Sequence, residues 1–164
     1  MRNSVWQVFR PAIVPRWAVI SCALLFMTRL PLQAELGGDV STIQSDQAHM
    51  KASRSTQEAT GYTVHEMKMP SGHVIREFAS PQGQVFGVAW QGPGVPDMKQ
   101  LLGQYYDQYI QGAQDAKAQR HGRGPLVIQE PGFVLQMGGH MRAMQGRAYI
   151  PNMIPPAVRA ETIR

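Results

Sequence analysis

The chain has 164 residues, with 16 lysine and arginine residues, 11 aspartate and glutamate residues and one cysteine. Residues 1–34 contain four of the basic residues, so residues 35–164 carry 12 basic and 11 acidic side chains and are nearly neutral. Near-neutrality argues against a nucleic-acid binder, and the position of Cys22 in the first segment excludes disulfides and thiolate chemistry from the rest.

The first 34 residues have the three parts of a secretory signal peptide. An apolar run at 17–28 is too short to span a bilayer, and Pro31 and Ala34 provide a helix end and a small residue for cleavage. Three arginines and no acidic residue come before the end of this run: Arg2, Arg10 and Arg16. We expect cleavage after Ala34 and no membrane span in the mature domain; the alternative, supported by Arg29, is an uncleaved anchor.

Residues 35–164 are expected to form a single α+β domain that begins with a short helix. Ser41 and Gln44 form a capping box, which predicts a short N-terminal helix ending near Ala52. The polar residues 51–61 that follow are typical of a loop.

A three-stranded antiparallel meander is predicted next, from a change to two-residue periodicity. Its strands cover 62–69, 73–79 and 85–91, and both loops have proline first and glycine third, an order suited to three-residue hairpin loops. Such loops pair Glu66 with Arg76 and His65 with Glu77 in the first hairpin, and Phe78 with Phe86 and Val74 with Trp90 in the second. The expected core face is then Val64, Val74, Phe78, Phe86, Val88 and Trp90.

One long amphipathic helix should follow, capped by Asp97 with Gln100 completing a capping box. Its apolar stripe has helical spacing: Met98, Leu101, Leu102, Tyr105, Tyr109 and Ala113. We expect this stripe to pack on the meander. Further antiparallel strands are predicted at 126–129, 133–137 and 141–150, with turns at Pro131-Gly132 and Gly138-Gly139, before an irregular proline-containing tail.

No catalytic motif is present, and no catalytic residue is assigned. The strongest binding candidates are one histidine, two arginines and one tyrosine within ten residues: His140, Arg142, Arg147 and Tyr149. Two guanidinium groups could clamp a carboxylate or phosphate. The alternative is that these are ordinary solvent-exposed charged residues of a strand, with the tyrosine packed at its rim. His65 beside Glu77 is a pairing typical of an oriented general base, and a surface cross-strand pair is the alternative.

A copper site is a further hypothesis, because thioether and imidazole groups are copper ligands. In the expected register one face of the first hairpin, opposite the core face, presents four of them: His65, Met67, Met69 and His73. A second group surrounds the glycine pair: Met137, His140, Met141 and Met144. Methionine also fills irregular gaps in cores, which is the alternative for both groups.

The chain contains a set of short segments that are distinctive when taken together: Leu36-Gly37-Gly38-Asp39, Tyr62-Thr63-Val64-His65-Glu66, Pro70-Ser71-Gly72, Val74-Ile75-Arg76-Glu77-Phe78, Val88-Ala89-Trp90-Gln91-Gly92-Pro93, Gly138-Gly139-His140-Met141-Arg142-Ala143 and Gly146-Arg147-Ala148-Tyr149. As a set they resemble an uncharacterised family of small exported bacterial proteins, domain of unknown function 2844. The resemblance implies a signal-bearing envelope protein of Gram-negative bacteria, periplasmic or secreted, and gives neither an activity nor a cofactor.

The function expected from the sequence is therefore a non-enzymatic module that binds an envelope protein or a small ligand. The alternatives are a periplasmic enzyme that uses the histidine and arginine residues above, and a copper-binding protein.

Overall fold

The computed structural model describes residues 35–42, 52–119 and 124–164. The chain divides into two units, Met1–Pro31 and Leu32–Arg164, and the fold below is that of the second unit. The expected signal peptide lies outside the described residues, as does most of the expected N-terminal helix. At the ends of that predicted helix, Val40–Thr42 forms a 3-10 turn and Ser53 already belongs to a strand.

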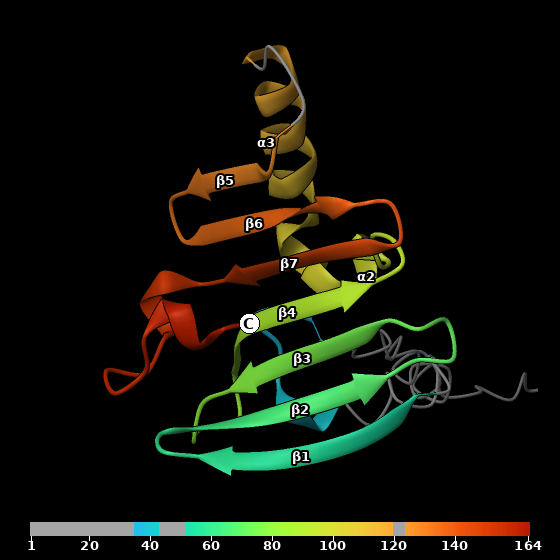
Figure 1. Ribbon diagram of the computed structural model, residues 1–164. Coiled ribbons are helices and arrows are strands. Elements are labelled where there is room, and N and C mark those ends of the chain that lie inside the picture. The colour runs from blue at the N-terminus through green and yellow to red at the C-terminus, as the bar shows by residue number, and fades with distance from the viewer. Residues whose placement is uncertain (1–34, 43–51, 120–123) are drawn as a thin grey trace, which may run out of the picture. The chain divides into compact units, whose positions relative to one another are not determined.

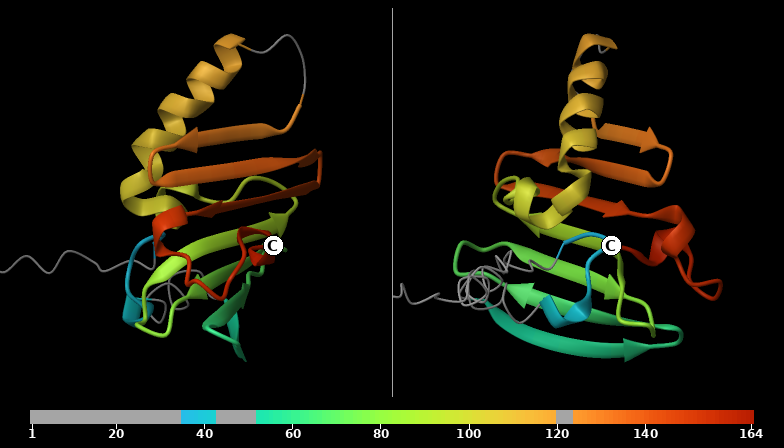
Figure 2. Two further views of the ribbon diagram at one scale, coloured as in Figure 1. Left: turned by 90° about the vertical axis from the view of Figure 1, so that its left-hand side faces the viewer. Right: turned by 180° about the vertical axis from the view of Figure 1, so that it is seen from behind.

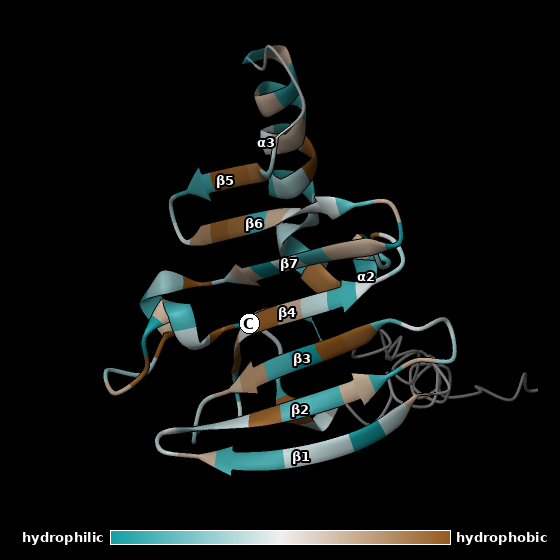
Figure 3. Cartoon of the chain, in the orientation of Figure 1, coloured by the Kyte–Doolittle hydropathy of each residue, from teal (hydrophilic) through white to brown (hydrophobic). Residues whose placement is uncertain are grey.

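The described residues form a seven-stranded antiparallel sheet in the order β1-β2-β3-β4-β7-β6-β5 (Figure 1). The strands are β1 (Ser53–Ala59), β2 (Tyr62–Lys68), β3 (Val74–Ala79), β4 (Val85–Gly92), β5 (Leu126–Glu130), β6 (Phe133–His140) and β7 (Ala143–Tyr149). Each half is a meander of hairpins, and the two halves join where β4 pairs with β7. Hydrophobic residues are prominent in β4, β5 and β6, whereas β1 is hydrophilic along most of its length (Figure 3).

This architecture corrects the expected fold class. The prediction of an N-terminal helix, a separate three-stranded meander, a long helix on that meander and further strands was wrong as a whole, because one continuous sheet organises the domain. The expected meander is only its β2–β3–β4 part, extended by β1 on one side and by β7 on the other. The polar sequence of β1 hid that strand, since six of its seven residues are exposed.

The first hairpin has the predicted register and the second does not. Glu66 lies opposite Arg76 and His65 opposite Glu77, as the three-residue loop required. In the second hairpin the register shifts between Phe78 and Ala79, so that Ala79 lies opposite Val85 but Phe78 lies opposite Gly87 and Ile75 opposite Trp90. A bulge at Phe86 causes the shift, because an extra residue in one strand reverses the faces of all residues beyond it.

The expected long helix is broken near its start. Asp97 caps it as predicted, with Oδ1 accepting from the backbone N–H groups of Lys99 at 3.0 Å and Gln100 at 3.1 Å. The helix α2 (Met98–Leu102) then gives way to a 3-10 turn at Gly103–Tyr105, followed by α3 (Tyr106–Gln119). α2 buries Met98, Leu101 and Leu102, whereas α3 has no fully buried residue.

The packing of α3 also differs from the expectation. It lies over β5, at the far end of the sheet from the meander (Figure 2). Gly112 allows this approach, since a Cβ atom there would lie 2.7 Å from Cγ2 of Ile128. The ring of Tyr105 stacks on Phe133 of β6, with centroids 5.3 Å apart.

Each face of the sheet has its own core. On the face that carries the helices, Met67, Ile75, Val88, Trp90 and Leu135 belong to the larger cluster. The smaller cluster lies on the opposite face and is closed by the C-terminal segment. Its fully buried members include Phe86 and Ile163, and the second of these comes from the tail. The expected single core face of the meander is thus divided between two cores, because the bulge at Phe86 moves Val88 and Trp90 to the helix face.

Candidate functional site

The described part of the chain contains a groove of about 1340 Å³. Its lining residues come from both faces of the sheet, from α3 and from the C-terminal segment: Arg76, Trp90, Gln91, Ala113, Ala116, Lys117, Gly124, Pro125, Leu126, Val127, Gln136, Met137, Gly138, Gly139, Met144, Gln145, Gly146, Arg147, Glu161 and Arg164. Four lining side chains are basic and one, Glu161, is acidic. The groove therefore carries a formal charge of +3 in a domain that is close to neutral.

The strand registers arrange the basic part of the groove, which we define as Arg76, Arg147 and Arg164. Arg76 of β3 and Arg147 of β7 both lie opposite Ala89 of β4, on its two sides. Side chains that are direct cross-strand neighbours point to the same face, so both arginines lie on the face covered by the C-terminal segment. The side chain of Ala89, between the two arginines, is small and buried. It therefore does not fill the space between the two arginine side chains.

Arg147 is held by neutral oxygen atoms. Its Nε and Nη2 donate to Oε1 of Gln136 at 3.0 and 2.8 Å, and its Nη1 donates to the carbonyl oxygens of Ala160 at 3.0 Å and Ile163 at 3.4 Å. Its guanidinium carbon also lies 5.9 Å from the ring centroid of Tyr149, a cation–π distance. Within the described residues no carboxylate forms a salt bridge with Arg147. Its charge is thus fixed in place without being neutralised by an ion pair.

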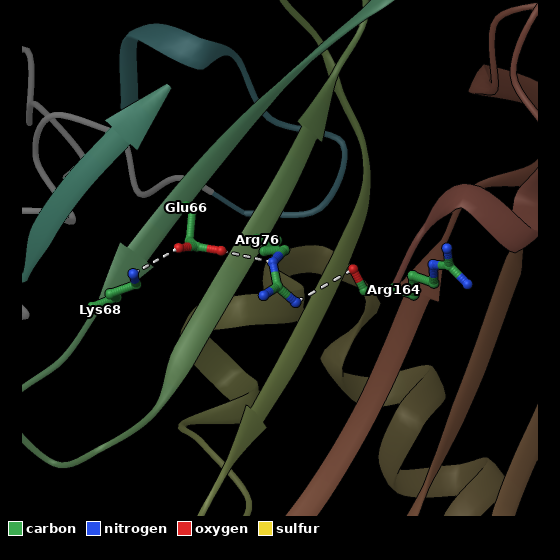
Figure 4. A network of polar contacts seen from close by, with 4 residues as sticks. All are labelled: Glu66, Lys68, Arg76 and Arg164. Carbon is green, nitrogen blue, oxygen red and sulfur yellow. Dashed lines mark hydrogen bonds and ion pairs between the residues drawn. The ribbon is translucent and has the colours of Figure 1, made fainter. Parts of the chain in front are cut away.

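Arg76 belongs to a more balanced network (Figure 4). Its Nε donates to Glu66 at 2.8 Å, and Lys68 lies 3.3 Å from the other oxygen of the same carboxylate. Desolvation of Glu66 favours its neutral form, but the hydrogen bonds and positive charges of Arg76 and Lys68 together outweigh it and lower the pKa of this carboxyl group, so it stays ionised at neutral pH. Arg76 Nη1 also donates to the carbonyl oxygen of Arg164 at 3.4 Å, which links β3 to the end of the tail.

The apolar part of the groove lies on the helix face, and we define it as Trp90, Ala113, Ala116, Met137 and Met144. α3 is close to β5 at Gly112, and the next helical turn supplies the small alanines that line the groove. Met137 lies directly opposite Gly146, whose missing side chain leaves space for the Trp90 ring, since a Cβ there would lie 2.3 Å from Cζ2 of Trp90. Trp90 is 2% exposed, and its Nε1 has no hydrogen-bond partner among the described residues.

The four predicted binding residues separate into two pairs. Arg147 and Tyr149 are two positions apart and share the tail-facing side of β7, and of these two only Arg147 lines the groove. His140 and Arg142 are exposed at the β6–β7 turn, which is formed by Met141 and Arg142 rather than by the glycine pair. His140 Nδ1 lies 3.1 Å from the carbonyl oxygen of Met141, and Arg142 adopts a φ of 67°.

His65 lies in a buried polar cluster outside the groove. Its side chain is 4% exposed, and its Nδ1 is 2.9 Å from Nη2 of Arg54 and 3.2 Å from Oγ1 of Thr56. Arg54 can only donate, so Nδ1 accepts and the neutral ring carries its proton on Nε2. Burial, together with the charge of Arg54, lowers the pKa of His65. The opposing Glu77 is 1% exposed, so the pair belongs to the interior and not to the surface.

The proposed copper ligands have different surroundings from those expected. Met67 is fully buried in the larger core, and His65 lies on the same face of the hairpin. The expectation that these side chains lie opposite the core face was therefore wrong, because this face is itself covered by a core. Met69 packs against that core, and His73 contacts Ser71 Oγ at 2.9 Å and the carbonyl oxygen of Gly94 at 3.2 Å. Among the described residues no three histidine, cysteine or acidic side chains form a metal-binding group. Copper binding through methionine stays a prediction.

The sequence did not indicate most of the groove. The lining includes Arg76 of β3, Gln91 of β4 and Gln136 of β6, which only the nonlocal pairing of β4 with β7 brings onto one face of the sheet. Lys117 comes from α3, which packs on β5. The available signal was the pair of small residues, Ala113 and Ala116, on the inner side of a helix. Small side chains one helical turn apart leave empty space beside a helix when the strands facing them are rich in glycine, as β6 and β7 are here.

The domain is thus an antiparallel sheet protein with one helical segment on one face, a tail on the other and an open, basic and apolar groove. Residues 32–163 match the family described as Protein of unknown function (DUF2844), and the chain belongs to this family. The match confirms the resemblance seen in the sequence. Neither the curated proteins nor the solved structures include a match to this chain. Among the described residues, no helix is long and apolar enough to cross a membrane.

Proposed function

We propose that this protein is exported to the envelope of a Gram-negative bacterium and that residues 35–164 act there as a non-enzymatic binding module. The observation that carries the proposal is the groove of about 1340 Å³, which is larger than the roughly 300–1,000 Å³ of a typical ligand pocket and so has room for a small molecule. Its polar groups are guanidinium, ammonium and amide groups, which orient a ligand by hydrogen bonds and charge.

Export rests on the composition of residues 1–34. Positive charge, a short apolar run and a small residue after Pro31 form the pattern that signal peptidases recognise. The absence of cysteine after residue 34 means that the domain needs no disulfide in an oxidising compartment.

The position of the buried histidine favours binding over catalysis. A general base must lie within hydrogen-bond reach of its substrate. His65 and Glu77 do not line the groove, and both side chains are almost completely buried. Their geometry fits a polar contact inside the fold, where Arg54 and Thr56 satisfy the imidazole.

One experiment tests both parts of the proposal. The full chain is expressed in a Gram-negative host without added tags, and the periplasmic fraction is analysed by mass spectrometry under denaturing and native conditions. The denatured mass should correspond to residues 35–164, and the native mass should include a bound small molecule that is lost on unfolding. Retention of residues 1–34, or a native mass equal to that of the protein alone, would contradict the proposal.

A further inference from the structure

We infer that the helix face of the groove binds an elongated, uncharged aliphatic molecule whose carbonyl oxygen accepts a hydrogen bond from Nε1 of Trp90. This inference rests on the proposed binding function and names the class of ligand. The whole site lies on one face of the sheet, so the ligand crosses no paired strand. The inference follows from an unpaired donor in the floor of the groove and from the apolar side chains that line the rest of this face.

The strand registers place the floor of the site in one row across four strands. Trp90 of β4 lies opposite Gly146 of β7, and Met137 of β6 lies on the other side of Gly146. Leu126 of β5 lies opposite Met137 and completes the row. Trp90 and Leu126 belong to the larger core, so the row lies on the face that carries the helices. Neighbouring strands are about 4.8 Å apart, so the row spans roughly 14 Å, enough for an aliphatic chain of medium length.

Trp90 provides the directional contact. Its side chain is almost completely buried, and Nε1 has no hydrogen-bond partner among the described residues. The ring atoms nearest to the position of a Cβ atom at Gly146 are Cζ2 and Cε2, and Nε1 is bonded to Cε2. This edge of the indole therefore faces the row where the row has no side chain. An unpaired buried N–H group is unfavourable, and an indole N–H can only donate, so the ligand must supply an acceptor.

The wall beside the row suits an aliphatic chain. Ala113 and Ala116 lie one turn apart on α3 and contribute only methyl groups to the lining. Met137 and Met144 are half-buried in the strands of the same face. Methionine side chains are flexible and polarisable, so they adapt to the contour of a chain without directional contacts. These groups favour an apolar body and add no hydrogen bond to that of Trp90.

The distribution of charge favours an uncharged ligand. Among the lining residues of the helix face, the one charged side chain is Lys117, which is exposed near the end of α3. The arginines of the groove lie on the other face of the sheet. A carboxylate beside Trp90 would thus be buried without an opposite charge, which is costly. A pure hydrocarbon would leave Nε1 unpaired, whereas a ketone or ester on an aliphatic body avoids both problems.

The test uses the protein purified from the periplasm and freed of apolar compounds on a hydrophobic resin. Residues 35–164 contain one tryptophan, so the indole N–H signal of the domain in proton–nitrogen NMR spectra reports Trp90. Two probes are compared: methyl hexyl ketone and its alkene analogue, in which a methylene group replaces the carbonyl oxygen. The ketone should move the indole proton signal downfield, because a hydrogen bond deshields this proton, and the alkene should not. The same shift with both probes, or no shift with the ketone, would overturn the inference.

Chain length and location are tested by affinity. Methyl hexyl ketone should bind at least about tenfold more tightly than methyl ethyl ketone, because each buried methylene is worth about fourfold in affinity. Ala116→Phe fills the apolar part of the groove and should weaken binding of methyl hexyl ketone by about tenfold or more. Ala118→Phe is the matched control, since it places the same side chain on an exposed position of α3 outside the groove lining. Melting curves confirm that both variants are folded, and equal affinities for the two ketones or equal losses in the two variants would refute the site.

The outcomes also separate this inference from the proposed function. A native mass spectrum with a bound molecule that has no carbonyl group on an aliphatic body, together with no binding of methyl hexyl ketone, would refute the ligand class and leave the binding function standing. Absence of any bound molecule and of any binding of methyl hexyl ketone would refute both.

Discussion

The C-terminal segment closes the smaller core through a contact between Ile163 and Gly87. Ile163 is 0% exposed, and a Cβ atom at Gly87 would lie 2.8 Å from its Cδ1 and 3.3 Å from both its Cγ1 and Cγ2. Gly87→Ala should therefore destabilise the domain by about 1–3 kcal/mol through overpacking. Ile163→Ala removes three carbon groups worth about 0.8 kcal/mol each, and the remaining cavity raises the expected cost to about 3 kcal/mol.

The double variant gives the sharper result. Truncation of Ile163 removes the three atoms nearest to the new methyl group at position 87. The two changes should thus be non-additive, with a combined loss smaller than the sum of the single losses by about 1–2 kcal/mol. Denaturant unfolding of the wild type, both single variants and the double variant measures this coupling. Additivity within about 0.5 kcal/mol would refute the contact.

Three further predictions concern other parts of the fold. Burial lowers the folded-state pKa of His65 from its ordinary value of 6.5, so the unfolded chain binds the proton first as the pH falls. The free energy of unfolding, measured with denaturant at a series of pH values, should therefore decrease below pH 6.5. If His65→Gln keeps the whole of this decrease, another group causes it. Gly72→Val should cost about 1–3 kcal/mol because φ is +86°, and Gly94→Ala, with nothing within 4 Å, is the control expected to be neutral in thermal unfolding. Leu101→Ala should cost about 2–5 kcal/mol in urea unfolding, while the exposed Gln108→Ala should stay within about 0.5 kcal/mol; equal losses would show that the buried side of the helical segment is misassigned.

Local signals in the sequence were sufficient for turns and caps. The Pro-Ser-Gly loop set the register of Glu66 and Arg76, because a three-residue loop with positive φ at Gly72 permits only that pairing. Asp97 was a reliable helix start, since its carboxylate accepts from the N–H groups of the first turn. These features depend on residues only a few positions apart.

Features that depend on distant residues were not predictable in the same way. The bulge at Phe86 becomes favourable when the tail supplies Val158 and Ile163 to the smaller core, because the bulge keeps Phe86 with Phe78 in that core. β1 is a strand because its backbone pairs with β2, although its side chains are polar. Arg147 could be proposed as a binding residue because it lies close in the sequence to His140 and Arg142. Arg76 could not, because it comes near Arg147 only through the pairing of β3 and β7 with β4.

Methionine methyl groups provide the most direct measurement of the central claim, that the groove is the ligand site. The chain has 10 methionines, of which Met137 and Met144 line the groove and Met67 and Met98 are buried in the larger core. In NMR spectra of methyl-labelled protein, the small molecule that copurifies with the periplasmic protein should, when added back, shift the Met137 and Met144 signals and leave those of Met67 and Met98 in place. Shifts at Met67 and Met98 without shifts at Met137 and Met144, or no shifts at all, would contradict the account.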